Sequence, residues 1–238
     1  MTGGWGFCGG RRGVDLAVSP EKPRHICKLP PADSIGIYSQ PMLPELPEYG
    51  DQFELQVSIQ DITPAIWRRV RLPAEVTLGT LHDVLQIAFG WTNSHLHDFD
   101  INGITFGMLD VEDERFTVNE NAAPLGAVAR LGSRFTYLYD FGDSWEHDVA
   151  IERLLKRGGD SIECLDGARA CPPEDCGGPG GYGRMLEILA DPDDDEYDSM
   201  KQWVPRGYDP EKFNILAVNK KLATIAKRLG KTTKLRRV

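Results

Sequence analysis

The chain lacks any hydrophobic run of the length that a membrane span requires. A transmembrane helix needs roughly 18 to 20 consecutive apolar residues, and no stretch of the sequence approaches this length. The amino-terminal segment MTGGWGFCGGRRGVDLAVSP also lacks a continuous apolar core, so we expect no secretory signal. These absences predict a cytoplasmic protein with no membrane partner.

Cysteine is scarce, with five residues in the chain. Cys8 and Cys27 lie in the amino-terminal stretch, whereas Cys164, Cys171 and Cys176 form a cluster. An odd number with uneven spacing excludes the regular framework of a disulfide-stabilised secreted domain. The cluster is therefore expected to be metal-binding, redox-active or structural.

Positive charge is in deficit over the whole chain. The formal net charge is -9, which excludes a protein that coats DNA or acidic membranes over its entire surface. A local basic patch remains possible, and the last twenty residues contain eight Lys or Arg and no acid.

Hydrophobic periodicity is absent from residues 1–50, which are rich in Gly and Pro, so we expect an irregular tail there. Residues 51–220 are expected to form one domain, because 238 residues with 41% hydrophobic content suffice for one substantial core. Residues 221–238 are expected to hold the end of a carboxyl-terminal helix and a basic tail.

Alternation of apolar and polar residues predicts strands at 53–59 and 66–72. In the second strand, Arg68 shares a face with Ile66, Val70 and Leu72. Helical spacing from Leu78 to Phe89 follows, with Thr77 as a candidate amino-terminal cap and Gly90 at the end.

Further along, an Asn-Gly pair at 102–103 predicts a hairpin. Two more strands are expected around a turn at Gly142, and residues 157–183 read as a long ordered loop that ends in a flexible connector. A short helix is expected at 183–190 and a final helix at 215–229. Together these elements predict an α+β domain with a mainly antiparallel sheet, one early helix and carboxyl-terminal helices.

Three histidines are candidate metal ligands. If residues 95–101 and 143–151 are extended, His95, His97 and His147 lie on apolar strand faces. Three imidazoles around an open position are typical of a catalytic zinc site, and Asp140 or Asp143 would orient the rings from outside the ligand set. The alternative is that each histidine is a hydrogen-bonded core residue.

The cysteine cluster gives a second candidate zinc site. Cys164, Cys171 and Cys176 are spaced too widely for a C-x-x-C knuckle, so a tetrahedral structural site would need a fourth ligand such as His147. The alternative is a rigid loop in which the cysteines are small buried hydrophobic residues.

A candidate nucleic-acid patch lies on the strand at 66–72. Trp67, Arg69 and Arg71 share the face opposite Arg68, so they could bind phosphate together. Pairing of these arginines with the abundant carboxylates would explain the same pattern without DNA.

Three blocks together resemble the plasmid pRiA4b ORF-3-like family: IWRRVRLPAEVTLGTLHDVLQIAFGWTNSHLHDFDING, YLYDFGDSWEHDV and CLDGARACPPEDCGG. The resemblance covers about residues 51–220, and some members of this family are labelled as an insertion-sequence passenger protein (TnpR). It implies a one-domain α+β module, found on plasmids, insertion elements and chromosomes, for which no reaction is established.

We therefore predict a non-enzymatic binding or accessory module with a protein or DNA partner from a mobile element. One alternative is a metal-dependent hydrolase that uses His95, His97 and His147. The other is a protein with a structural zinc held by the three clustered cysteines and His147.

Overall fold

The structure is a computed structural model that describes residues 46–108 and 117–236, with side chains as far as Leu229. The amino-terminal tail predicted at 1–50 lies outside the described residues up to position 45. The described strands are β1 (Gln52–Ile59), β2 (Trp67–Pro73), β3 (His97–Ile101), β4 (Ile104–Gly107), β5 (Thr117–Asn119), β6 (Arg134–Tyr139), β7 (Trp145–Leu155) and β8 (Glu163–Ala168). The described helices are α1 (Leu78–Phe89), the 3-10 turn η2 (Glu120–Ala122), α2 (Leu125–Val128), α3 (Gly178–Ala190), α4 (Tyr197–Trp203) and α5 (Ile215–Arg236).

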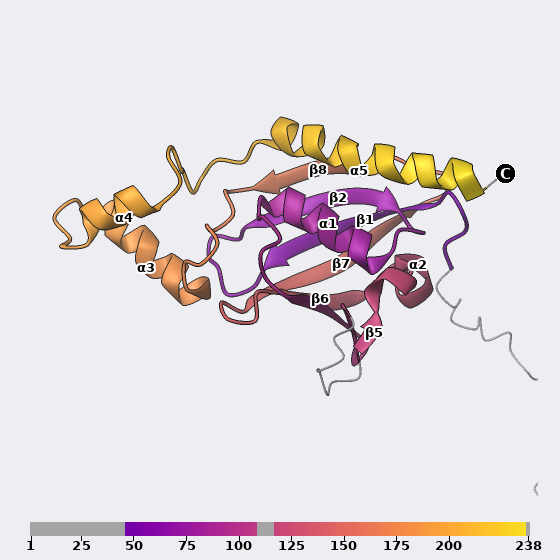
Figure 1. Cartoon of the computed structure of the whole chain (residues 1–238), viewed down its shortest axis with the longest axis horizontal. Helices are drawn as coiled ribbons and strands as arrows, with labels where there is room; N and C mark the ends of the chain where they lie inside the picture. The colour runs from indigo at the N-terminus through magenta and orange to yellow at the C-terminus, as the bar shows by residue number, and fades with distance from the viewer. Residues whose placement is uncertain (1–45, 109–116, 237–238) are drawn as a thin grey trace, which may run out of the picture. The chain divides into compact units, whose positions relative to one another are not determined.

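The strands form one sheet in the order β5-β4-β3-β6-β7-β1-β2-β8. Neighbouring strands are antiparallel except for β4 and β5, which pair in parallel. Helices α1 and α5 lie on the same side of this sheet, and α5 runs beside β8 (Figure 1). The predicted α+β fold with a mainly antiparallel sheet is confirmed.

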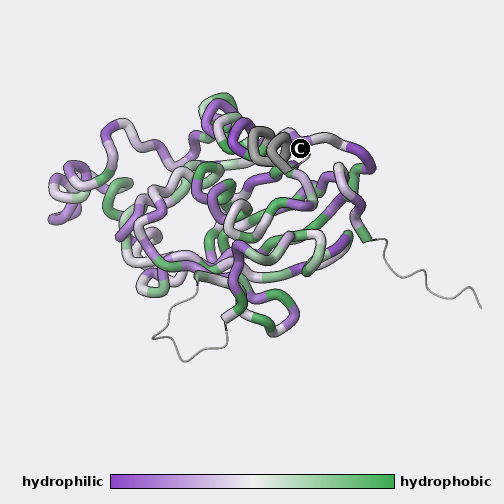
Figure 2. Tube along the Cα trace, turned by 45° about the vertical axis from the view of Figure 1, so that its right-hand side comes forward, coloured by the Kyte–Doolittle hydropathy of each residue, from purple (hydrophilic) through white to green (hydrophobic). Residues whose placement is uncertain are grey.

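Alternating side chains give the sheet one apolar and one polar face. On β1 and β2 the apolar set belongs to the core that also includes α1 and α5. Figure 2 shows hydrophobic and hydrophilic residues interspersed along the chain. Arg68 lies on the apolar face with Val70 and Leu72, as its position in the pattern predicts, and is almost completely buried. Arg69 and Arg71 lie on the opposite face and are half-buried.

Helix α1 begins and ends where its sequence predicts. The side chain of Thr77 accepts a hydrogen bond from the Thr80 amide at 3.2 Å and caps the first turn. Gly90 adopts a φ of 94°, a left-handed conformation that ends the helix and that glycine tolerates best. The buried side of α1 closes the core over the sheet.

Strands β3 and β7 begin later than predicted. β3 begins at His97, so His95 lies in the preceding turn, where Asn93 has a φ of 60°. β7 begins at Trp145, so Asp143 lies in the turn after β6. The expectation that His95 and His97 lie in a common strand is therefore wrong, because the extended strand begins at His97.

Helices α3 and α5 are longer than predicted. α3 begins at Gly178, although the glycine-rich stretch 177–183 was expected to be a flexible connector. Pro179 near its start presets a helical φ, and burial of Tyr182 and Met185 supplies tertiary stabilisation that local propensity does not reveal. α5 continues past Gly230 to Arg236, because a single glycine costs only about 1 kcal/mol in a helix.

Two smaller elements, β5 and η2, lie between β4 and α2 in the chain. Among the described residues, no helix has both the length and the hydrophobicity needed to cross a bilayer.

Candidate functional site

Arg68 is a buried cation that connects three elements. Its guanidinium donates hydrogen bonds of 2.7–2.8 Å to four backbone carbonyl oxygens, which belong to Trp67, Ala88, Ala168 and Arg169. Ala88 is in the last turn of α1, where unpaired carbonyl groups favour a positive charge. Within the part of the chain that the structure describes, no Asp or Glu pairs with Arg68, so the carbonyl dipoles compensate its charge in place of a carboxylate.

Aromatic rings enclose the same guanidinium. Its central carbon lies 3.9 Å from the centre of the Phe213 ring and 5.1 Å from that of Phe89. Both distances are within the range of a cation–π contact. Desolvation lowers the pKa of Arg68 from its ordinary value, but an arginine in a protein stays charged.

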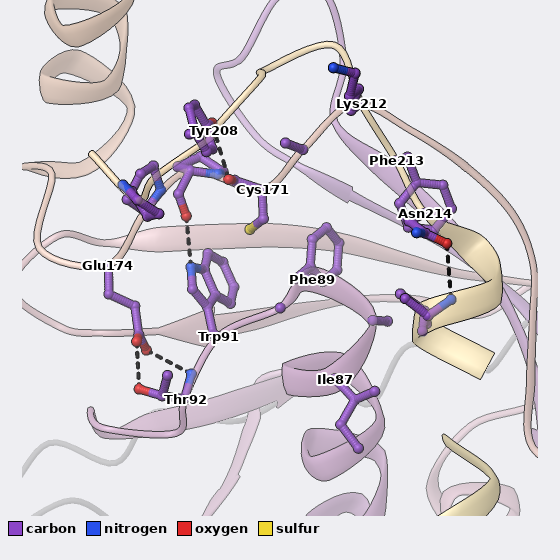
Figure 3. A pocket seen from close by; sticks show the side chains of 18 of the residues that line it. Ile87, Phe89, Trp91, Thr92, Cys171, Glu174, Tyr208, Lys212, Phe213 and Asn214 are labelled. Carbon is purple, nitrogen blue, oxygen red and sulfur yellow. Dashed lines mark hydrogen bonds between the residues drawn. The ribbon is translucent and has the colours of Figure 1, made fainter. Parts of the chain in front are cut away.

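A cavity of about 630 Å³ opens beside Arg68, between the end of α1, the loop after β8 and the start of α5. Figure 3 shows the rings of Phe89 and Trp91 facing this space together with Tyr208 and Phe213. The indole of Trp91 donates to the Pro172 carbonyl at 3.1 Å, so its ring is held in position. The volume falls in the range of pockets that bind small molecules.

The two ends of the cavity carry opposite charges. At one end, Glu174 accepts hydrogen bonds from the Thr92 amide (3.1 Å), the Thr92 hydroxyl (2.5 Å) and the Tyr139 hydroxyl (2.6 Å). Although desolvation acts in the opposite direction, these donors lower the pKa of Glu174. At the other end are Lys212, which pairs with Asp209 at 2.8 Å, and Lys221.

A second, more polar cavity of about 510 Å³ is lined by two stacked histidines. The rings of His82 and His97 are parallel, with centroids 3.4 Å apart. His97 Nε2 lies 2.8 Å from a carboxylate oxygen of Glu120, and the two ring nitrogens of His82 contact Tyr137 and Asn93, also at 2.8 Å. Burial lowers the pKa of His82 to about 4, so this ring is neutral at pH 7.

The structure does not bring His95, His97 and His147 together. His97 pairs with Glu120, and His147 is fully buried, with Nδ1 facing the backbone oxygens of Tyr137 and Trp145. Within residues 46–108 and 117–229, the one group of three potential ligands whose donor atoms lie within 4.8 Å of one another is His95, Asp140 and Asp175. The predicted three-histidine convergence is therefore wrong.

Of the two carboxylates predicted to orient the histidines, Asp140 lies beside His95, with 3.4 Å between Oδ2 and Nδ1. Asp143 instead accepts a hydrogen bond from the Gly177 amide at 3.0 Å. It therefore connects the turn after β6 to the start of α3 and contacts no histidine through that bond.

The three clustered cysteines are free thiols. Cys164 lies in β8 and donates to the Asp166 carbonyl at 3.3 Å, whereas Cys171 packs against the core beside the first cavity. Burial raises the pKa of all three thiols, that of Cys176 to about 12. They form no group of metal ligands with His147 in the described part of the chain. The alternative of a rigid loop, in which the cysteines are small buried hydrophobic residues, fits this arrangement better.

The candidate nucleic-acid patch is engaged by acidic neighbours. Arg69 forms an ion pair with Glu152 at 3.0 Å, and Arg71 pairs with Glu54 at 2.6 Å. Trp67 lies near Arg69, with 5.8 Å between the guanidinium carbon and the ring centre. The three side chains share a face as predicted, but the charge that phosphate would need is largely neutralised.

Sequence reasoning missed His82, Glu120 and Asp175 as members of polar clusters. His82 occurs at a position of α1 where the helical pattern gives no sign of a partner. Asp175 lies in the stretch 157–183 that is predicted as a long ordered loop, and Glu120 lies outside every predicted element. Their contacts join residues far apart in the chain, which a periodicity argument does not detect.

Known proteins are similar to this chain in sequence and in structure. Residues 51–217 match the model of a family described as plasmid pRiA4b ORF-3-like protein. The chain is 39% identical over 176 residues to "Uncharacterized protein y4hQ" of Sinorhizobium fredii, covering 72% of this chain and 91% of the relative. It also resembles the crystal structure of a protein of unknown function, MM3350, from Methanosarcina mazei Go1, with a TM-score of 0.64 and 35% identity over 70% of this chain and 96% of that one. Because the matched region spans well over half of its length, the chain belongs to the plasmid pRiA4b ORF-3-like family.

Proposed function

We propose that this protein is a non-enzymatic binding module whose ligand occupies the cavity beside Arg68. The ligand would combine an apolar or aromatic body with an anionic group. The observation that carries the proposal is a buried guanidinium with no carboxylate partner among the described residues, set in the wall of an aromatic cavity.

The walls of the cavity favour an apolar body. Binding sites for small molecules are concave and mostly apolar, with a few polar groups that fix orientation. Phe89, Trp91 and Phe213 supply flat apolar surfaces. Trp203 at the rim is 47% exposed, an unusual position for a tryptophan in a folded domain, and a ligand would cover it.

The charges favour an anionic group at the end of the cavity formed by α5. Arg68 retains one N–H group beyond the four that bind carbonyl oxygens, because a guanidinium has five. Lys221 lies at the rim with no ion-pair partner among the described residues. A carboxylate, sulfonate or phosphate would add the negative charge that this end of the cavity lacks.

The chemistry of the cavity favours binding over covalent catalysis. Burial raises the pKa of Cys171 well above its ordinary value, so this thiol is a poor nucleophile at neutral pH. Glu174, a carboxylate of the lining that also raises the pKa of Cys171, already accepts hydrogen bonds from three donors.

A role in mobile-element biology, which the family description suggests, would then be an accessory one exercised through a ligand or a partner. Direct DNA binding through Trp67, Arg69 and Arg71 is the less favoured version, because Glu152 and Glu54 neutralise the arginines. Binding to duplex DNA that weakens steeply with added salt would restore it.

The test is binding of anilinonaphthalene sulfonate, an aromatic anion, to the folded full-length protein. Quenching of tryptophan fluorescence reports occupancy, since Trp91 and Trp203 line the cavity. Lys221→Glu should weaken binding about three- to tenfold by reversing one rim charge. Lys220→Glu is the matched control, because Lys220 is exposed on the same helix outside the lining.

A second pair of variants tests the apolar wall. Trp203→Ala should weaken binding of the probe, whereas Leu216→Ala, which removes an exposed side chain of α5 outside the lining, should not. Absence of binding to the wild-type protein, or equal affinity for the Lys221→Glu and Lys220→Glu variants, would refute the proposal.

A further inference from the structure

His95 lies between two turns that each present a carboxylate to it. Its Nδ1 is 3.4 Å from Asp140 Oδ2, and its Nε2 is 3.3 Å from Asp175 Oδ1. Asp140 follows β6, and Asp175 belongs to the loop between β8 and α3. Three segments far apart in the sequence therefore converge on one imidazole.

Negative charge exceeds positive charge at this point. A third carboxylate, that of Glu174, is also near: its interaction with His95 is one of the contributions that lower the pKa of Glu174. The structure gives Asp140 and Asp175 no Lys or Arg partner within the described residues. Even a protonated His95 would leave a net negative charge, and a divalent cation would neutralise it.

The carboxylate of Asp140 is oriented toward His95 by its own turn. Its Oδ1 accepts hydrogen bonds from the Gly142 and Asp143 amides at 2.9 and 3.3 Å. Oδ2 is left to face His95, although the residue is only 7% exposed. The turn therefore presents one oxygen of a largely buried carboxylate to the imidazole.

The contacts of His95 are close but are not hydrogen bonds. Its Nε2 is buried and has no hydrogen-bond partner, although Asp175 Oδ1 is 3.3 Å away. A zinc ion binds a histidine through one ring nitrogen, with a bond of about 2.0 to 2.1 Å. One donor atom from each of His95, Asp140 and Asp175 lies within 4.8 Å of the other two, so a single ion between them would take one ring nitrogen and one oxygen of each carboxylate.

The segments that carry these donors are anchored to one another. The Gly177 amide donates to Asp143, which connects the loop of Asp175 to the turn of Asp140. The turn that holds His95 is fixed by the bond from the Ser94 amide to the Tyr139 hydroxyl at 3.1 Å. Pre-positioned ligands reduce the ordering that metal binding requires.

We propose that His95, Asp140 and Asp175 bind one divalent transition-metal ion, with zinc as the best match for one nitrogen and two oxygen donors. Water would complete the coordination. The ligand set differs from both sets that the sequence suggests, because it excludes His97, His147 and the cysteines. The inference does not depend on the ligand proposed for the cavity.

The alternative is that His95 bridges the two carboxylates through its two ring nitrogens, with no metal ion. The two interpretations differ in whether zinc binds and in whether Asp175 is needed for it.

The test is calorimetric titration of chelator-stripped, full-length protein with Zn²⁺ at neutral pH. Wild-type protein should bind one ion, and Asp175→Asn should lower the zinc affinity at least tenfold. Tenfold is the lower end of the loss caused by removing a residue that only supports a metal ligand, so loss of a ligand should cost no less. Asp193→Asn, at an exposed acidic position between α3 and α4, should leave affinity unchanged. Since Asp175 is 73% exposed, its variant should remain folded, unlike a variant of a core residue.

Cobalt substitution distinguishes this site from a cysteine site. Ligation by nitrogen and oxygen gives no sulfur-to-cobalt charge-transfer band, whereas ligation by cysteine thiolate gives an intense one. Absence of zinc binding, zinc binding that survives Asp175→Asn, or a thiolate band would each overturn the proposal. Loss of the site in both Asp175→Asn and His95→Ala, with the band absent, would support it.

Discussion

Replacement of Arg68 by methionine should destabilise the fold by about 3 to 5 kcal/mol. The side chain donates four hydrogen bonds to backbone carbonyl oxygens of β2, α1 and the end of β8. Methionine retains the apolar stem but leaves those oxygens without a donor, and each lost bond costs about 1 kcal/mol. Loss of the contact with Phe213 adds roughly 1 kcal/mol, and the favourable burial of methionine offsets part of the sum.

Urea unfolding followed by circular dichroism measures this loss as a lower midpoint with an unchanged slope. Arg69→Met is the matched control, since Arg69 is the next residue, is partly exposed and pairs with Glu152. That variant should lose no more than about 1 kcal/mol. A loss below about 1 kcal/mol for Arg68→Met, or equal losses for the two variants, would refute the view that Arg68 holds α1 against the sheet.

Two further predictions concern stability. Burial lowers the pKa of His82 and His147 to about 4, so between pH 6.5 and 4 the unfolded chain binds protons that the folded chain does not. The free energy of unfolding should therefore fall as the pH is lowered through this window, by roughly 3 kcal/mol per histidine at most. Urea midpoints that stay constant from pH 7 to 5 would contradict it. Gly181→Ala should lower the melting temperature, because the new Cβ meets the Cys176 carbonyl oxygen, whereas Gly183→Ala, which enters open space in the same helix, should raise it. Shifts of the same sign in thermal melts would show that this packing does not decide stability.

The sheet could be predicted from the sequence because its signal is local. In β2 the period of two places Arg68 with Val70 and Leu72 on the buried face, and the structure has them there. A charged residue among apolar ones on a strand face indicates a buried side chain that needs hydrogen-bond partners. The pattern does not indicate which residues those partners are. Those partners come from Ala88 and Ala168, which are 20 and 100 residues away.

The polar clusters could not be predicted, because they depend on contacts between distant segments. His95 and His97 alternate as strand residues would, yet the strand starts only at His97. His97 is then paired with Glu120, 23 residues away, and stacked on His82. No spacing rule links these three residues before the fold is known.

The loop between β8 and α3 connects the two proposed sites. Its composition of Gly, Pro and Cys predicts an ordered loop, and its backbone and side chains are held at several points. Ala170 donates to the Pro210 carbonyl, Pro172 accepts from Trp91, and Gly177 donates to Asp143. Irregular backbone that is packed against the core needs such hydrogen-bond partners, because each buried polar group without a partner would carry a desolvation cost.

This anchoring determines how the loop can serve both sites. The loop presents Cys171 to the aromatic cavity and Asp175 to His95, and Glu174 between them ties it to Thr92 and Tyr139. A rigid loop lets each site keep its geometry without its ligand, which is the condition for selective binding at modest ordering cost. Because the loop is rigid, substitution of Glu174 should disturb both the cavity beside Arg68 and the proposed metal site. Substitution of Lys221 or of Asp193 should leave the proposed metal site intact.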